Sequence, residues 1–345
     1  MARILFGVQG EGMGHAIRSD ILLRYLTKNH EIRIFAGNRA YKFLSKRFRH
    51  VEEIESQNIG YKNSRVVFFG TIWLNLKKFP KFRVSYRKLK QTVKDFQPDI
   101  IISDFEALTN FLGNFSKAPL IQINNQNDII FRKNKLKLSQ VAAYINTWLV
   151  TKVFTFGADK YIMYSLDPME DTEKKIYTGN LIKDEMKKRK HRYGDHIFVY
   201  QTSNTGEKLI DILKQLDENF IVYGFNKNKK EKNIIFRKFN DDIYFEDYCE
   251  AKALIANGGL TTITEAIYMK KPILSIPIKG QYEQVFNAKT VEKMGFGMYL
   301  KEGSKEKITE FLNKQPKYTK NLQKYKPISN EQIFRKVEKQ IRLLS

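Results

Sequence analysis

A turn of two glycines between an apolar run and a helical segment constrains the fold of this chain more than any other feature. The apolar run covers residues 252–256, and the residues after it are Asn257, Gly258, Gly259, Leu260, Thr261 and Thr262. A strand that enters a helix through such a tight turn is typical of parallel α/β sheets. The helix start presents unpaired N–H groups and the positive end of its dipole, which favour a bound anion. The pattern therefore predicts an α/β fold with an anion site, and we expect the diphosphate of a nucleotide there.

A carboxylate follows this turn at the spacing of one helical turn. Glu265 lies four residues after Thr261, so both side chains are on one face of the predicted helix. Glu265 is therefore the candidate that accepts hydrogen bonds from ribose hydroxyls. Thr202 and Ser203 follow the predicted strand over residues 197–201 and form a second polar loop that could reach the diphosphate. In the plainer interpretation, both segments are ordinary strand-to-helix turns with N-capping hydroxyls.

A second glycine-rich turn follows the apolar residues 4–8. It contains, in order, Gly10, Gly12, Gly14 and His15. The first two glycines begin like the dinucleotide fingerprint, but His15 stands in place of the third. The next predicted strand, residues 31–35, is followed by Ala36 and Gly37 rather than by the acidic residue that holds a ribose. We therefore expect no nicotinamide or flavin site, and instead a histidine at the carboxyl end of a strand, where open α/β sheets place their chemistry.

His15 is the candidate general base. The dipole at a helix start favours the neutral imidazole, and a positioned base contributes on the order of a hundredfold to ten-thousandfold in rate. Asp104 ends the buried-type strand over residues 100–103, and the ends of nearby parallel strands converge, so its carboxylate could orient the imidazole. Glu106 is a weaker candidate for the same role. The alternatives are that His15 only bonds the loop and that Asp104 caps a helix over residues 105–115.

These residues together resemble the GT-B glycosyltransferases, and the resemblance covers most of the chain. It is closest to the group that includes the enzyme adding N-acetylglucosamine to the lipid-linked peptidoglycan precursor, and more distant to the plant UDP-glycosyltransferases. The donor signature of these families is His-Cys-Gly-Trp-Asn-Ser-x-x-Glu. It is matched in register by Asn257, Gly259, Thr261, Thr262 and Glu265. The resemblance implies an α/β fold of two Rossmann-like domains with a cleft between them.

The resemblance also implies how the donor is held. The helix start at residues 258–262 would take the diphosphate, and Glu265 would take the ribose. Glu283 and Gln284 match the pair that contacts the sugar hydroxyls, and Asn287 matches the asparagine that follows this pair.

In the first glycine-rich turn, the resemblance places the catalytic base at His15. Asp104 matches the supporting aspartate of the plant enzymes only loosely, and Gly12 and Gly14 are further donor-binding candidates. Asn257 departs from the pattern, because it stands where the families have histidine, and its contact with the phosphates is expected to differ accordingly.

We therefore expect an inverting, metal-independent transfer of a sugar from a nucleotide diphosphate, with UDP favoured, to a hydroxyl acceptor such as a lipid or a polyprenyl-linked glycan. His15 would deprotonate the acceptor, and backbone donors at residues 258–262 would stabilise the departing diphosphate. No Asp-x-Asp motif stands at a predicted strand end, so we expect no metal and no cofactor besides the nucleotide-sugar co-substrate. The alternatives are a UDP-sugar 2-epimerase of the same fold and a basic nucleic-acid-binding protein, which would leave both glycine turns unexplained.

Composition limits the expected location. Cys249 is the one cysteine of the chain, which excludes a disulfide framework and suits a reducing cytoplasm. The first residues form a predicted strand rather than a secretory segment, and no apolar run approaches the length of a membrane span. We expect a cytoplasmic protein. Its formal net charge of +24 suggests an anionic partner.

Residues 61–94 combine large apolar side chains with many cations. Those that we expect at an acceptor or membrane surface are Phe68, Phe69, Trp73, Lys77, Lys78, Phe79, Lys81, Phe82 and Arg83. Such a mixture suits an anionic membrane, where each cation near the surface contributes about 1 kcal/mol. Peripheral attachment to the cytoplasmic face of a membrane is therefore one expectation. The other is a core strand and helix with solvated lysines, in a chain that is basic throughout.

Alternating apolar runs and helical segments predict two parallel, doubly wound sheets. The expected strands of the first are residues 4–8, 31–35, 100–103, 120–123 and 160–164, and those of the second are 197–201, 220–224, 234–237, 254–256 and 273–276. We place an N-terminal acceptor-binding domain at residues 1–182 and a C-terminal nucleotide-sugar-binding domain at 183–325. Residues 326–345 would form a final helix that packs back on the first domain.

Overall fold

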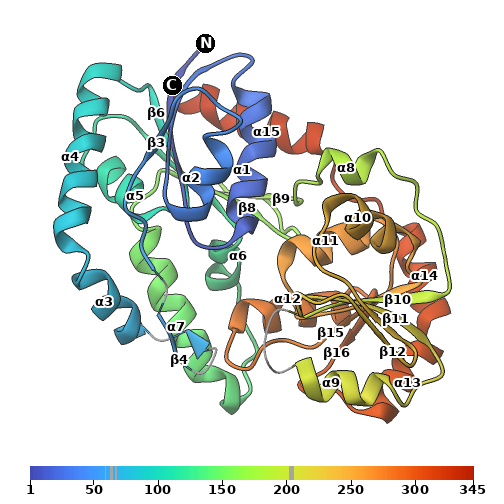
Figure 1. Ribbon diagram of the computed structural model, residues 1–345. Coiled ribbons are helices and arrows are strands. Elements are labelled where there is room, and N and C mark those ends of the chain that lie inside the picture. Colours follow the sequence, from blue (N-terminus) through green and yellow to red (C-terminus); the bar gives the residue numbers. More distant parts are fainter. Residues whose placement is uncertain (59, 63–64, 67, 202–205) are drawn as a thin grey trace. The chain divides into compact units, whose positions relative to one another are not determined.

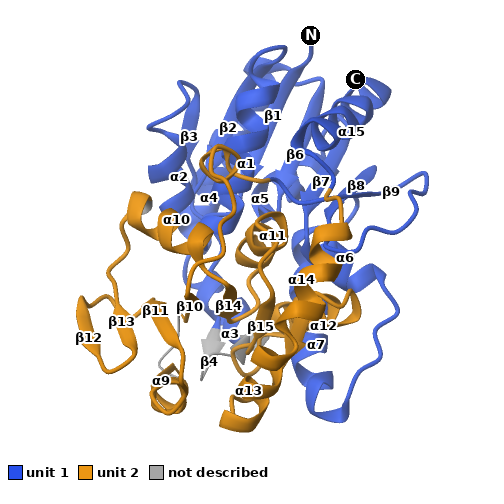
Figure 2. Ribbon diagram, turned by 90° about the vertical axis from the view of Figure 1, so that its right-hand side faces the viewer, with its two compact units in different colours: residues 1–181, 328–345 blue, residues 182–327 orange. Residues whose placement is uncertain are grey.

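The computed structural model describes residues 1–58, 60–62, 65–66, 68–201 and 206–345. It divides into two compact units (Figure 2). Unit 1 consists of Met1–Leu181 and Ile328–Ser345, and unit 2 consists of Ile182–Pro327. Over the described residues, each unit is built around its own seven-stranded sheet with helices, so the predicted α/β class is confirmed.

The sheet of unit 1 is parallel throughout, in the order β3-β2-β1-β6-β7-β8-β9. Its strands are β1 (Arg3–Val8), β2 (Glu31–Ala36), β3 (Val51–Glu53), β6 (Ile100–Asp104), β7 (Leu120–Asn124), β8 (Lys160–Tyr164) and β9 (Lys175–Thr178). The chain first adds strands on one side of β1 and then on the other side, starting with β6. This reversal leaves a crevice at the carboxyl ends of β1 and β6, which is the usual ligand position in such sheets.

The sheet of unit 2 repeats this plan in the order β12-β13-β11-β10-β14-β15-β16, with only β12 antiparallel to its neighbour. Its strands are β10 (His196–Tyr200), β11 (Asn219–Tyr223), β12 (Lys229–Glu231), β13 (Ile234–Phe236), β14 (Ala253–Ala256), β15 (Ile273–Ser275) and β16 (Gly297–Tyr299). Here the strand order reverses between β10 and β14, so the second crevice lies at their carboxyl ends.

Helices connect the strands in both units (Figure 1). Unit 1 contains α1 (Met13–Leu26), α2 (Asn38–Leu44), α3 (Phe68–Leu76), α4 (Phe79–Phe96), α5 (Ala107–Asn114), α6 (Gln126–Phe131), α7 (Leu138–Phe154) and α15 (Asn330–Leu344). Unit 2 contains α8 (Asp184–Lys187), α9 (Gly206–Leu213), α10 (Asp241–Glu250), α11 (Leu260–Tyr268), α12 (Tyr282–Lys293), α13 (Lys305–Asn313) and α14 (Gln315–Lys324).

Strands β6 and β14, at the centres of the two sheets, are buried along their whole length. Ile100, Ile101 and Ile102 of β6 are fully buried, as are Leu254 and Ile255 of β14. Continuous apolar runs of this kind are expected of parallel sheets and explain why these strands could be recognised in the sequence.

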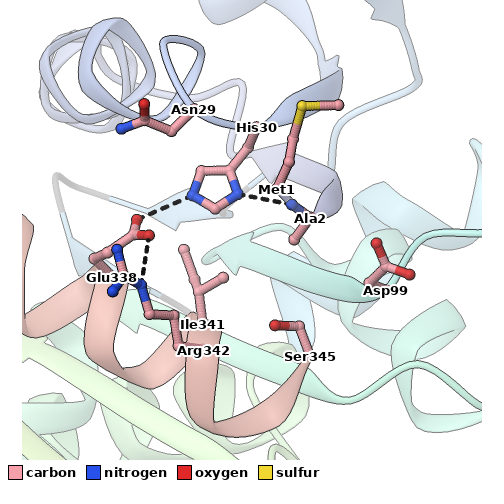
Figure 3. A pocket seen from close by; sticks show the side chains of 9 residues that line it. All are labelled: Met1, Ala2, Asn29, His30, Asp99, Glu338, Ile341, Arg342 and Ser345. Atoms are coloured by element: carbon pink, nitrogen blue, oxygen red, sulfur yellow. Dashed lines mark hydrogen bonds and ion pairs between the residues drawn. The ribbon is translucent and has the colours of Figure 1, made fainter.

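The last helix, α15, belongs to unit 1 and is fixed there by aromatic and ionic contacts. The rings of Tyr25 and Phe334 stack with centroids 4.4 Å apart. His30 accepts a hydrogen bond from the backbone N–H of Ala2 through Nδ1, and its Nε2 lies 3.0 Å from Glu338 Oε2. Figure 3 shows Ala2, His30 and Glu338 lining a pocket together with Arg342, which also pairs with Glu338.

Every strand predicted from the sequence is present, and the bounds differ by one or two residues at most. The strands that were not predicted are β3, β9, β12, β16 and the short pair β4 (Tyr61–Lys62) and β5 (Arg65–Val66), because runs of two to four residues show no periodicity. The helix predicted over residues 105–115 begins only at Ala107, since Phe105 has a φ of 57° and leaves the helical region.

Candidate active site

In unit 1 the crevice holds a paired histidine and carboxylate. His15 is the third residue of α1, and its Nδ1 lies 2.7 Å from Oδ1 of Asp104, the last residue of β6. Asp104 also accepts a hydrogen bond of 2.9 Å from Ser19 Oγ, and its side chain is 2% exposed against 12% for His15. When Nδ1 donates its proton to this fixed carboxylate, Nε2 keeps its lone pair and can accept a proton. The fold thus brings together the two residues that were predicted to act as a pair.

Two of the alternative roles predicted here, an N-cap at Asp104 and a pairing of Glu106 with His15, are wrong. Glu106, not Asp104, is the N-cap of α5, and its carboxylate accepts hydrogen bonds from the N–H groups of Leu108 and Thr109. Glu106 is fully buried in that role, and burial raises its pKa. It is therefore not the partner of His15. Between the two carboxylates, Phe105 adopts a left-handed backbone conformation and stacks on the His15 ring with centroids 5.8 Å apart.

Residues that the sequence interpretation missed complete the surroundings of His15. The guanidinium of Arg18 is buried, lies 3.3 Å from His15 Nδ1 and donates a hydrogen bond of 3.1 Å to Asn125. The amide nitrogen of Gln126 lies 3.4 Å from His15 Nε2. Arg18 follows His15 by three residues, so helical spacing alone could have suggested it. Asn125 and Gln126 follow β7, and only the folded sheet brings them here.

The glycines of the first turn have different roles. Gly12 has a φ of 77° and is the N-cap of α1, with no side chain capping the helix and nothing within 4 Å of an added Cβ. The start of α1 is therefore open at Gly12, and Gly14 is partly exposed. Gly10 is needed for packing instead, because a Cβ there would lie 2.3 Å from Ser56 Oγ.

In unit 2 the crevice contains the anion turn predicted from the sequence. After β14, Gly258 adopts a φ of 96°, and a Cβ added there would lie 2.8 Å from the backbone oxygen of Gln284. Gly259 is the N-cap of α11, and no atom of the described residues lies within 4 Å of a Cβ added to it. No side chain caps α11 among the described residues, so the first N–H groups, those of Leu260, Thr261 and Thr262, face an open space that an anion can fill.

The polar side chains predicted around this turn fall into three groups. Thr261, Thr262 and Glu283 are partly exposed. Asn257 is buried and donates to Gln201 Oε1 at 2.5 Å, and the partly exposed Gln284 accepts from the N–H of Ile278 at 2.9 Å. The Asn287 amide donates to the carbonyl of Gly258 and so holds the turn in place. Thr202 and Ser203 lie outside the described residues.

Glu265 is buried and already has a partner. Its side chain is 4% exposed, and Oε1 lies 2.9 Å from the Nζ of Lys183, which no pattern in the sequence connected with it. Burial raises the pKa of Glu265, and the charge of Lys183 opposes that shift.

Several side chains predicted at an acceptor or membrane surface are exposed to solvent. On α3 and α4, Trp73 is 62% exposed and Phe79 is 63% exposed. Lys77, Lys81 and Arg83 are exposed as well, whereas Phe82 is half-buried and Lys78 pairs with Glu55 at 2.5 Å. The side chains of Phe68 and Phe69 lie outside the described part of the structure.

The described residues contain neither a cluster of metal ligands nor a membrane-spanning helix. No group of three or more His, Cys, Asp or Glu side chains is arranged to hold a metal ion. No helix in the described ranges has the length and apolar character needed to cross a membrane.

Comparisons with known proteins show the family and the fold of this chain. A family model described as glycosyl transferase family 1 matches residues 2–316. A glycosyltransferase of Methanosarcina acetivorans is 26% identical, over 86% of this chain and 85% of its own length. The UDP-N-acetylglucosamine–N-acetylmuramyl-(pentapeptide) pyrophosphoryl-undecaprenol N-acetylglucosamine transferase of Thermosipho melanesiensis is 27% identical over 66% of each chain. Among solved structures, a UDP-glucosyltransferase from Polygonum tinctorium shares the fold, with a TM-score of 0.70, 11% identity and coverage of 99% and 98%.

Proposed function

This chain belongs to glycosyl transferase family 1, and from that premise we propose that it moves a sugar from a UDP-sugar to a hydroxyl acceptor, with inversion and without a metal ion. The family and the GT-B fold make the chain a glycosyltransferase. The family favours transfer over the epimerase, which shares the fold, and also over the nucleic-acid alternative. The donor base, the stereochemistry and the acceptor belong to the proposal.

The observation that supports the chemistry best is the buried pair of His15 and Asp104 at the crevice of unit 1. In the proposed step, Nε2 of His15 takes the proton of the acceptor hydroxyl while that oxygen forms a bond to the anomeric carbon. The bond from this carbon to the diphosphate oxygen breaks on the opposite face, which inverts the configuration. Asp104 stabilises the imidazolium that results.

The start of α11 is proposed to stabilise the leaving group. The backbone N–H groups of the residues after Gly259 and the hydroxyls of Thr261 and Thr262 would donate hydrogen bonds to the diphosphate as its negative charge increases. This arrangement supplies positive potential without a cation. Glu265 would accept the ribose hydroxyls, and Glu283 would contact the sugar. The nucleotide sugar is then the co-substrate, and no further cofactor is needed.

The exposed aromatic and basic surface of unit 1 supports a lipid-linked acceptor. The face of α3 and α4 described above continues onto α7, which contacts α3 and exposes Leu138 and Trp148. Lys133, Lys135 and Lys137 are exposed just before α7. Apolar side chains among cations suit the headgroup region of an anionic membrane. We propose peripheral attachment to the cytoplasmic face of the membrane, where such an acceptor would be found.

Nucleotide binding without metal tests the donor site directly. The protein is heated with UDP, GDP, dTDP or CDP in the presence of a chelator, with Glu265→Ala as the control. Stabilisation by UDP that is reduced in the variant supports the proposal, because a ligand of the folded state raises its apparent stability. No stabilisation by any of the four nucleotides would refute it.

Turnover tests the catalytic step. UDP-sugars are incubated with lipid and glycan extracts, and the anomeric configuration of the product is determined by NMR. We expect the anomeric configuration of the product to be inverted. His15→Gln should abolish transfer of the sugar, and the variant should still bind UDP. A retained configuration, or full transfer by His15→Gln, would contradict the proposed role of His15.

A further inference from the structure

The ionic pair of Lys183 and Glu265 lies at the position assigned to the ribose of the donor. Glu265 is in α11, one turn beyond the anion turn, and Lys183 is the N-cap residue of α8. Their charged atoms are 2.9 Å apart, and the side chains are 19% and 4% exposed for Lys183 and Glu265. The ammonium also lies 5.1 Å from the centre of the Phe245 ring. Lys183 therefore has a defined position over the buried carboxylate.

The buried position makes this pair a barrier to the ligand. With so little of Glu265 exposed, ribose hydroxyls reach its carboxylate only after the more exposed partner has moved away. Lys183 can move at modest cost, because its ammonium regains water when it leaves a partly exposed pair. Glu265 cannot do so, because it is held in the first turns of a buried helix and burial raises its pKa.

We propose that Lys183 competes with the ribose of the nucleotide for Glu265 and so determines how tightly ribonucleotides bind. The inference rests on the proposed function, because it assumes that a nucleotide binds at the start of α11 with its ribose at Glu265. The 2′ and 3′ hydroxyls of UDP displace the ammonium, and the pair forms again when the nucleotide leaves. Such a competitor weakens the binding of the product UDP, which favours its release after transfer.

The competition predicts that removing the ammonium strengthens binding. By calorimetry, Lys183→Met should bind UDP roughly two- to fivefold more tightly than the unaltered chain, which corresponds to the range for a partly exposed ion pair. Binding of 2′,3′-dideoxy-UDP should be unchanged, because this ligand has no hydroxyls to compete for Glu265. Lys183→Arg keeps the charge and should bind UDP like the unaltered chain.

Two further variants separate this effect from general changes in charge or folding. Lys187→Met removes a lysine of α8 whose ammonium lies 3.3 Å from Asp184 instead, and it should leave UDP binding unchanged. In a Glu265→Gln background, Lys183→Met should no longer increase the affinity for UDP. If Lys183→Met fails to fold, as judged by circular dichroism, Lys183→Gln keeps a polar side chain, and the same tightening is expected.

The outcomes distinguish the inference from the function beneath it. Equal or weaker binding of UDP by Lys183→Met overturns the inference while the nucleotide site stands. If Lys183→Met binds UDP and 2′,3′-dideoxy-UDP more tightly by the same factor, the inference is also overturned, because the ribose hydroxyls would then not contribute to the effect. If neither protein binds any nucleoside diphosphate, the proposed function fails and the inference fails with it.

Discussion

Substitution of Gly258 by alanine tests whether the anion turn needs its unusual backbone. At a φ of 96°, a side chain is strained by roughly 1–2 kcal/mol. The new Cβ would also lie 2.8 Å from the backbone oxygen of Gln284, and relieving such overpacking costs roughly another 1–2 kcal/mol. Alanine restricts the unfolded chain and returns about 0.5 kcal/mol. Gly258→Ala should therefore lower the free energy of unfolding of unit 2 by about 2–3 kcal/mol.

Gly259 provides a matched control one residue away. Its φ of −64° suits alanine, and nothing lies within 4 Å of the added Cβ. The small loss expected for alanine at an N-cap and the small gain in the unfolded state should cancel to within about 0.5 kcal/mol. The methyl group would instead occupy the open space at the start of α11. Gly259→Ala should thus be stable but bind UDP at least about tenfold more weakly, a loss of about 1.4 kcal/mol.

Urea denaturation followed by circular dichroism measures the stability of both variants, and calorimetry measures the binding of UDP. Tryptophan fluorescence is unsuitable for this purpose, because both tryptophans, Trp73 and Trp148, belong to unit 1. A Gly258→Ala protein as stable as the unaltered chain would refute the need for a left-handed glycine. A Gly259→Ala protein with unchanged affinity for UDP would show that the diphosphate does not rest on this turn.

Three further predictions concern other sites. Burial lowers the pKa of Lys271 from 10.5 to about 8, so the buried charge destabilises the folded state below that pH. The difference in the free energy of unfolding between Lys271→Met and the unaltered chain should decrease by about 3 kcal/mol as the pH rises from 7 to 11. Urea midpoints that differ by a constant amount over this range would contradict this. Asp104→Asn should reduce UDP release from a UDP-sugar by on the order of a hundredfold or more with UDP affinity retained, whereas unchanged release would exclude an orienting role. Trp73→Ala with Phe79→Ala should weaken sedimentation with anionic vesicles, and equal sedimentation would argue against membrane contact.

The parts of the fold that were predictable are those that the local sequence determines. Strands β6 and β14 are continuous apolar runs, which parallel sheets require, and the glycines after β1 and β14 indicate the turns that follow. Strands β3 and β16 lie at the sheet edges with three residues each, too few to show a period. Their pairing depends on the neighbouring strand rather than on their own composition.

The candidate site also contains contacts that could be predicted from the sequence and contacts that could not. His15 and Asp104 could be predicted as a pair, because both stand at carboxyl ends of strands that a doubly wound sheet brings together. The contact of Lys183 with Glu265 could not, because it joins segments far apart in the chain and depends on side-chain packing. The same holds for Gln126, which reaches His15 only through the connection after β7.

The place of α15 in the chain determines which of the two units can be completed first during synthesis. Unit 1 begins at Met1, is interrupted by the whole of unit 2, and is completed only by Ile328–Ser345. On the ribosome, residues 182–327 are therefore available to fold before the first unit has its final helix. A premature stop codon directly after Pro327 would leave the second unit whole and the first without the Phe334 and Glu338 side chains that contact Tyr25 and His30. Completion of unit 1 thus depends on residues that are translated after the whole of unit 2.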